Sequence, residues 1–187
     1  MQIDKDEIVR LTEEYGGAWG LNHTRRVLQL VNRVAEDIAY DRDAVWLAAH
    51  LHDWGAYSAW ARPGVGHDMR SVEVAEEFLR DRSLSEPEMR LVLECIRTHH
   101  SGDRERSIEA ILLSDADGLD FLGAVGVLRD FSKSPRDLRR GYESAKARME
   151  KVPPRLCLAK SKAIAAERMS EMAQILRALE EGSFGCF

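Results

Sequence analysis

The amino-acid sequence predicts an all-α fold, and two kinds of pattern indicate it. Apolar residues recur at helical spacing along most of the chain, as at Val27, Leu30, Val31, Val34 and Ile38, which fall at i, i+3, i+4, i+7 and i+11. Residues that begin helices separate these runs: Ser85-Glu86-Pro87-Glu88 is a capping box with a proline in the first turn. No strand-like alternation of apolar and polar residues persists, and no internal repeat is present.

Length and composition limit the class of protein. The chain has 187 residues, enough for one domain or a domain with an appendage. An apolar fraction of 44% can supply a core, and charged residues at 32% can supply a hydrated surface. The net charge of −5 argues against a stable nucleic-acid complex or an anionic-membrane binder. No apolar run approaches the ~18–20 residues of a membrane span, so we expect no membrane association.

The termini and the cysteines suggest a cytoplasmic protein. Asp4, Asp6 and Glu7 crowd the N-terminus, which lacks the apolar segment of a signal peptide. The three cysteines are odd in number, few and widely spaced, which is typical of reduced thiols, and Cys95 is expected in the core.

The first two helices are separated by glycine. A short amphipathic helix is expected over about 4–15, stopped by Gly16-Gly17. The run that begins with Val27 belongs to a second helix over about 20–40. His23 lies four residues before Val27 and therefore extends its buried stripe.

The third helix, capped by Asp41 or Asp43, runs into His52-Asp53. Adjacent helical side chains point about 100° apart, so this pair can reach one ion only where the helix ends. Gly55 is the expected stop, and His50 should point away from such a site. The dipeptide alone is more often a helix-end histidine beside a solvated aspartate than a metal site.

The segment over 54–66 has no helical period and is expected to be a loop. Its aromatic residues, including Tyr57 and Trp60, could form a lid or a base-stacking wall. Packing of these rings onto the core is the favoured interpretation. Beyond the loop, a helix opens at His67, and the helix begun by the capping box delivers His99 and His100 at its end.

A further helix over about 108–117 should end near Asp117, with Asp115 and Asp120 as caps or solvated residues. Residues 133–151 hold seven Lys and Arg against three acids, a local excess of +4. A solvated helical face is the default interpretation of that excess, and a phosphate-attracting rim is the alternative.

Pro153-Pro154 breaks the chain before a last helix over about 156–181. The apolar stripe of this helix is expected to be core packing or the face of a homodimer. With Ala166-Glu167-Arg168 and its closing Leu-rich turn, this helix loosely resembles the tail of small stand-alone bacterial HD proteins, some of which act as metal-dependent nucleotide pyrophosphohydrolases.

The ordered set of His23, His52-Asp53, His67, His99-His100 and Asp117 resembles the ligand pattern of the HD-domain metal-dependent phosphohydrolase superfamily. The resemblance covers residues 19–132. It implies an HD-domain helical bundle, with 133–182 as a helical extension of a single domain over 1–187.

The resemblance implies one or two metal ions. The first would bind His23, His52, Asp53 and Asp117. The second would bind His67, His99 and the other oxygen of Asp53, with His100 as a ligand or as a proton donor to the leaving group. Histidines with carboxylates suit Mn²⁺, Fe²⁺, Co²⁺ or Zn²⁺ better than Ca²⁺ or Mg²⁺.

We therefore expect an enzyme that hydrolyses a phosphoester or phosphoanhydride of a nucleotide or another small phosphorylated metabolite by metal-activated water. Asp53 and His100 would serve the chemistry. Arg26, three residues after His23, and the basic 133–151 segment could hold a second phosphate. Two alternatives remain: an HD-type diiron oxygenase with a similar ligand set, and a non-catalytic binding module, which has no need of these ligands.

Overall fold

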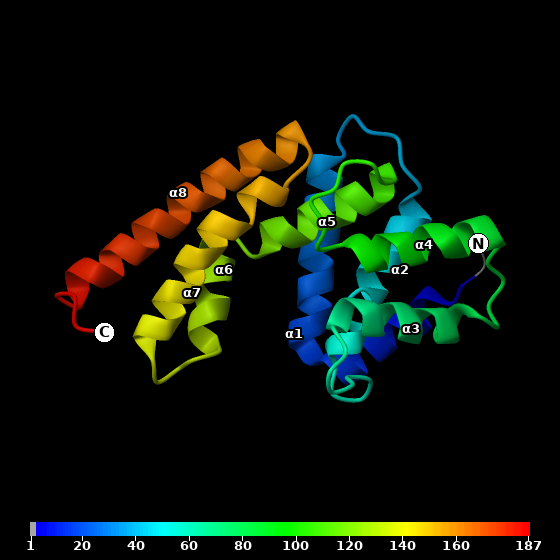
Figure 1. Ribbon diagram of the computed structural model, residues 1–187, viewed down its shortest axis with the longest axis horizontal. Coiled ribbons are helices and arrows are strands. Elements are labelled where there is room, and N and C mark those ends of the chain that lie inside the picture. The colour runs from blue at the N-terminus through cyan, green and yellow to red at the C-terminus, as the bar shows by residue number, and fades with distance from the viewer. Residues whose placement is uncertain (1–2) are drawn as a thin grey trace.

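The computed structural model describes residues 3–187, and every regular element in that range is helical (Figure 1). The all-α prediction is thereby confirmed. In chain order the elements are α1 Lys5–Val34, α2 Arg42–Leu51, η1 Trp54–Ala56, α3 His67–Leu79, α4 Glu86–Thr98, α5 Ile108–Asp120, α6 Gly123–Ser132, α7 Leu138–Lys151, η2 Pro153–Arg155 and α8 Ala159–Gly182. No helix in the described range is long and apolar enough to cross a membrane.

Helix α1 is two helices joined at a kink, close to the prediction. Gly17 has φ 63° and ψ −174°, a conformation that favours glycine, and it ends the first helical segment. The second segment stops at Val34 rather than near residue 40. Ile38 still packs against the core, because a turn closed by its N–H and the Ala35 carbonyl (2.9 Å) continues the apolar side of the helix.

Helix α5 is the central element of the fold. It packs against α1, α2, α4, α6 and α8, which explains why every residue from Ala110 to Asp120 is buried. In Figure 1 the helices α6, α7 and α8 extend from α5 to one side, while α1 to α4 surround it on the other. Residues from the two groups of helices therefore contact opposite parts of α5.

The loop after α2 is anchored by its aromatic rings, as expected. Trp54 is fully buried, stacks on Trp60 with ring centroids 4.6 Å apart, and donates its indole N–H to Thr12. Burial of a side chain of this size stabilises the fold by roughly 2–3 kcal/mol. Tyr57 is also buried and lies against Gly16 and Gly20. A Cβ atom would come within 2.4 Å of its ring at Gly16 and within 2.6 Å of its hydroxyl at Gly20.

The last helix packs into the protein's own core. Met172 is completely buried, and Ala165 and Leu176 lie beside it on the apolar stripe. Of the two interpretations of this stripe, core packing accounts for these residues. Cys95 is buried as predicted.

Candidate metal centre

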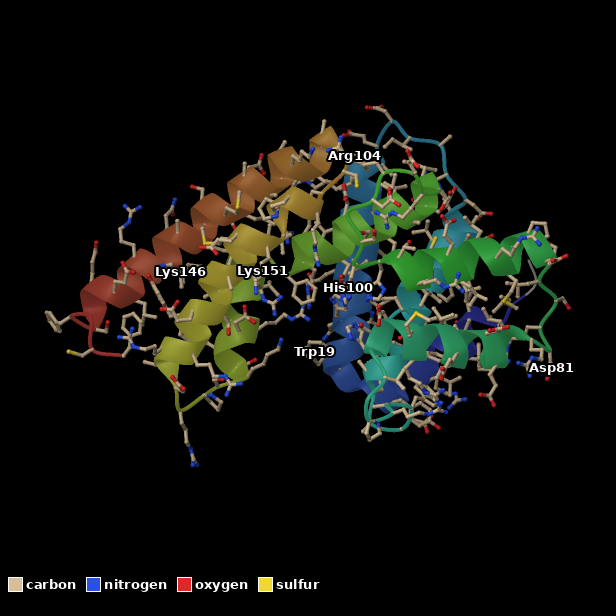
Figure 2. The ribbon with its side chains drawn as sticks, in the orientation of Figure 1. Trp19, Asp81, His100, Arg104, Lys146 and Lys151 are labelled. Atoms are coloured by element: carbon tan, nitrogen blue, oxygen red, sulfur yellow. The ribbon has the colours of Figure 1, made fainter. Side chains whose placement is uncertain are left out.

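A cavity of about 600 Å³ opens between helices α1 to α5, here called the bundle, and the segment from α6 to η2, here called the α6–η2 arm. Figure 2 shows His100 and Trp19 beside this opening. One end of the cavity is lined by the predicted ligands Asp53, His67, His100 and Asp117. The other end is lined by Lys133, Arg148 and Arg155, and the wall between the two ends includes Tyr15, Trp19, Tyr57, Phe121 and Arg129.

Four predicted ligands, His23, His52, Asp53 and Asp117, converge beneath the cavity floor. The Nε2 atoms of His23 and His52 lie 3.2 Å apart, and Asp53 Oδ2 is 3.6 and 3.5 Å from them. Asp117 Oδ1 is 3.3 and 3.8 Å from the same two nitrogens. Ligand atoms that bind one ion at about 2.0–2.2 Å lie roughly 3.0–3.6 Å apart. Four of the five distances lie in this range and the fifth is 3.8 Å, so the spacing is close to that around a single transition-metal ion.

A second group consists of His67, His99 and His100, each with a ring nitrogen within 4.8 Å of the others. Both aspartates of the first group also face this one. Asp53 Oδ1 lies 3.9 Å from His67 Nε2, and Asp117 Oδ2 lies 3.7 Å from His100 Nε2. Each carboxylate therefore presents one oxygen to each group, an arrangement that the sequence suggested for Asp53 alone.

Hydrogen bonds on the far side of the rings fix the histidine tautomers. His52 Nδ1 lies 2.8 Å from the Ala49 carbonyl, and His99 Nδ1 lies 2.6 Å from the Ile96 carbonyl. A carbonyl only accepts, so Nδ1 must carry the proton and Nε2 turns a lone pair toward the site. Histidines that bind metals are commonly held in this way.

The polar atoms of the site fit a metal ion. His99 Nε2 and Asp117 Oδ2 are buried without a hydrogen-bond partner within residues 3–187. Buried polar atoms are rarely left in this state unless a ligand completes them. A set of imidazole nitrogens and carboxylate oxygens suits Mn²⁺, Fe²⁺, Co²⁺ or Zn²⁺.

The electrostatics hold His99 and Asp117 in forms that bind metals, but they favour a protonated His23. Burial lowers the pKa of His99 to about 4, so this ring is neutral near pH 7. Burial would raise the pKa of Asp117, but its hydrogen bond to His23 holds it far below the ordinary value. Burial also acts to lower the pKa of His23, yet the hydrogen bonds to Asp117 and Asp120 outweigh it and raise this pKa to about 9. Metal binding at His23 therefore competes with a proton.

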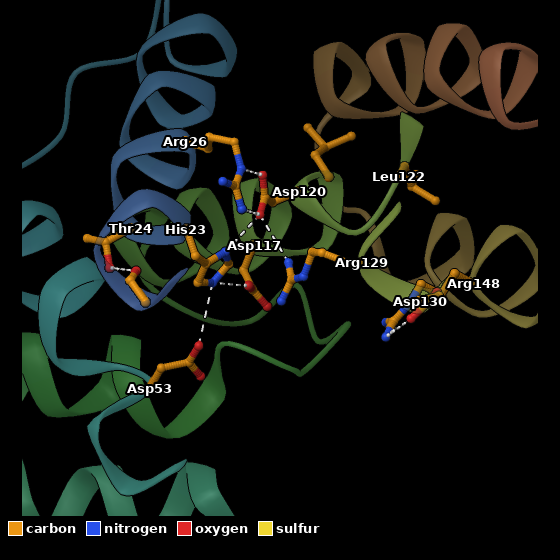
Figure 3. A network of polar contacts seen from close by, with 12 residues as sticks. His23, Thr24, Arg26, Asp53, Asp117, Asp120, Leu122, Arg129, Asp130 and Arg148 are labelled. Atoms are coloured by element: carbon orange, nitrogen blue, oxygen red, sulfur yellow. Dashed lines mark hydrogen bonds and ion pairs between the residues drawn. The ribbon is translucent and has the colours of Figure 1, made fainter. Parts of the chain in front are cut away.

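The expectation that Asp115 and Asp120 cap the helix or are solvated is wrong for Asp120 and only partly right for Asp115. Both are 1% exposed, because α5 continues to residue 120 and is packed on all sides. Asp120 accepts from His23 Nδ1 (2.8 Å), from Arg26 and from Arg129 (Figure 3). Asp115 accepts from the backbone N–H groups of Cys157 and Leu158, so it caps the start of α8 instead of its own helix.

Arg26 contacts the site only through Asp120. Its guanidinium donates to both oxygens of that carboxylate at 2.7 and 2.9 Å. It lines a separate hollow of about 550 Å³ between α1 and α8, and not the cavity above the ligands. His50 lies outside the site as expected: its Nδ1 donates to the Trp46 carbonyl, and its ring packs on the Trp46 ring.

The basic segment 133–151 divides between its two interpretations. Lys133 and Arg148 line the cavity, and Arg148 forms a bidentate ion pair with the buried Asp130. The other five cations are exposed on the surface: Arg136, Arg139, Arg140, Lys146 and Lys151.

Sequence reasoning missed two cavity cations, Arg129 and Arg155. The sequence does contain a signal for the first. Arg129 and Asp130 interrupt an otherwise apolar helix, and a charged pair in such a place is often buried.

Comparison with known proteins identifies the family. The sequence profile of the HD domain matches residues 20–122, more than half of the chain, so the protein belongs to the HD domain family. None of the curated proteins compared matches it significantly.

Solved structures share the fold. Bacillus subtilis YpgQ in complex with ADP is 23% identical, with a TM-score of 0.73 over 95% of this chain and 93% of that one. An HD-superfamily hydrolase from Bacillus thuringiensis is 22% identical, with a TM-score of 0.72 over 95% and 96% of the two chains. A protein from Lactobacillus plantarum is 18% identical, with a TM-score of 0.74 over 97% and 98%.

Proposed function

We propose that this protein is a metal-dependent phosphohydrolase that cleaves a phosphoester or phosphoanhydride of a nucleotide or another small phosphorylated metabolite. One observation carries the proposal: in both Asp53 and Asp117, one carboxylate oxygen faces the first histidine group and the other oxygen faces the second. Two ligand groups that share carboxylates are suited to a pair of ions side by side. When bound, such ions supply a nucleophilic water at neutral pH and neutralise phosphate oxygens.

The residues of the chain divide the work of this reaction. His23, His52, Asp53 and Asp117 would hold one ion, and His67 and His99 would hold a second together with the shared carboxylates. His100 is 35% exposed at its side chain and lines the cavity, so it can reach a bound substrate. Burial lowers the pKa of His100, so its ring is neutral near pH 7 and serves as a ligand in that form.

The cationic end of the cavity favours a phosphorylated substrate over a neutral one. Lys133, Arg148 and Arg155 line it within a chain of net charge −5. Cations opposite a metal centre attract an anion that spans the two ends, and guanidinium groups bind phosphate by charge-assisted hydrogen bonds. The likeness to YpgQ, which was solved with ADP, makes nucleoside phosphates the first substrates to test.

Metal analysis combined with a substrate panel tests the proposal. The purified protein is loaded with Mn²⁺, Fe²⁺, Co²⁺ or Zn²⁺, its metal content is measured, and phosphate release is followed from nucleoside mono-, di- and triphosphates and from phosphodiesters. We expect one or two ions per chain and turnover of at least one phosphorylated class. O₂ consumption with a mixed-valent iron spectrum, in the absence of phosphate release, would instead establish the oxygenase alternative.

A further inference from the structure

Arg129 is a buried cation at the wall of the cavity. It lies on α6, is 7% exposed, and lines the same cavity as Asp53 and Asp117. Its guanidinium carbon lies 4.7 Å from the centroid of the Trp19 ring and 4.3 Å from that of Phe121. Contacts of this kind favour a cation over an aromatic face and hold the planar group in one orientation.

The hydrogen bonds of Arg129 are incomplete. A guanidinium carries five N–H donors. Within the described part of the chain, this one makes a single side-chain hydrogen bond, from Nη1 to Asp120 Oδ2 at 3.1 Å, and its Nε is buried without a partner. Arg148, by contrast, donates to both oxygens of Asp130 at 2.6 and 3.0 Å.

Neutralisation of Asp120 does not account for Arg129. That carboxylate already accepts two hydrogen bonds from Arg26 and one from His23. Burying an additional charge there is costly unless the charge has a further partner. In Figure 3 the Arg129 guanidinium lies beside Asp117 and Asp120, at the metal end of the cavity.

We propose that Arg129 is a catalytic residue that donates hydrogen bonds to oxygens of the reacting phosphate, with Asp120 and the Trp19 and Phe121 rings as its positioning partners. The inference rests on the proposed function. A phosphate presents oxygen pairs that match the guanidinium fork. Negative charge spreads over these oxygens during phosphoryl transfer, and an arginine that meets it lowers the barrier.

The test is the replacement of Arg129 in the metal-loaded protein, with the substrate that the panel identifies. Arg129→Gln should lower kcat by at least ~10²-fold and change KM much less, because the contact strengthens as charge develops. The bound metal should be unchanged. Arg129→Lys keeps the charge but lacks the guanidinium fork, so its kcat should also fall by at least ~10-fold. This variant replaces Arg129→Gln as the test if the glutamine variant fails to fold.

Arg82→Gln is the matched control. Arg82 also lies over an aromatic ring, that of Phe78, and pairs with a carboxylate, that of Glu7, but it is remote from the cavity. Its replacement should leave kcat unchanged. A kcat within about 3-fold of wild type for Arg129→Gln, or a loss of bound metal in proportion to the loss of kcat, would overturn the inference.

Failure of the proposed function gives a different result. If the wild-type protein hydrolyses nothing in the panel, binding of inorganic phosphate to the Mn²⁺-loaded protein, measured by calorimetry, decides the role of Arg129. At least ~10-fold weaker binding in Arg129→Gln supports an oxyanion contact. Unchanged binding overturns it.

Discussion

The two ends of the cavity are built by different physical means. At the metal end, His52, His99 and Asp117 are about 1% exposed, and hydrogen bonds or ion contacts hold them on helices of the bundle. At the cationic end, long side chains project from the α6–η2 arm, and that of Lys133 is 54% exposed. Changes at the first end should therefore abolish function, while changes at the second should be graded and sensitive to salt.

The largest effect is expected from Asp53→Asn at the metal end. The substitution keeps the volume of the side chain but removes the charge that faces both histidine groups. Turnover should fall by at least ~10³-fold, about 4 kcal/mol in the barrier. The metal-free protein should melt at nearly the wild-type temperature, while the loaded protein loses the stabilisation that bound metal confers.

The control for this substitution is Asp81→Asn, which changes an exposed carboxylate at the far end of α3. It should alter neither turnover nor metal content. Retention of most phosphoester hydrolysis by Asp53→Asn would mean that the reaction occurs elsewhere in the protein.

The second prediction distinguishes the contributions of the two ligand groups at the metal end. Joint replacement of His67 and His99 by Ala removes two of the three histidines of the second group. The bound metal should fall to half, and turnover should fall by about 10²-fold, near 2.7 kcal/mol. Metal content per chain and the rate of phosphate release measure the two consequences, and circular dichroism should show an unchanged fold. An unchanged metal content would show a mononuclear site in which these histidines serve packing or substrate binding.

The third prediction concerns a buried histidine outside the site. Burial lowers the pKa of His50 to about 4, whereas the unfolded chain should titrate near the ordinary value of about 6.5. As the pH falls below 6.5, only the unfolded state takes up this proton, so stability is lost between pH 6.5 and 4. Between pH 7 and 5 the loss from this residue should be about 2 kcal/mol.

His50→Gln isolates this contribution, because glutamine does not titrate. Urea unfolding of both proteins at pH 7 and pH 5 should show that the variant loses less stability than the wild type over this interval. Equal losses would mean that His50 does not resist protonation in the folded state.

The smallest effect is expected at the cationic end. Arg155 lines the cavity and has no ion-pair partner within residues 3–187. Arg155→Gln should raise KM by about 5-fold and leave kcat unchanged, since a half-exposed charge contributes on the order of 1 kcal/mol. The difference should disappear near 1 M salt, where the Debye length falls to about 3 Å. A KM difference that persists in high salt would indicate a direct, desolvated contact.

Most of the helices and the set of candidate ligands could be predicted because their signals lie in the sequence itself. Periodicity places Val27 and its neighbours on one face, and the order of histidines and aspartates resembles a known pattern. The role of Asp120 could not be predicted in this way. Its hydrogen-bond partners His23 and Arg26 lie 97 and 94 residues away, so its burial depends on the packing of α1 and α6 against α5.

The cations that line the cavity were also only partly predictable from the sequence. Composition identified a basic segment, but only Lys133 and Arg148 of that segment face the cavity. Arg129 and Arg155 lie outside it, on α6 and η2, yet both line the cavity.

Two histidines of the site also finish the helices that carry them. His52 and His99 are the C-cap residues of α2 and α4, and their rings satisfy carbonyls that a helix end otherwise leaves without a partner. A carboxylate has no N–H to offer there and would place negative charge at the negative end of the helix dipole. The residue at which each helix ends therefore also determines the direction in which its histidine ring points. Inserting or deleting one residue in either helix would turn the ligand about 100° away, so these two helices should tolerate substitution far better than any change of length.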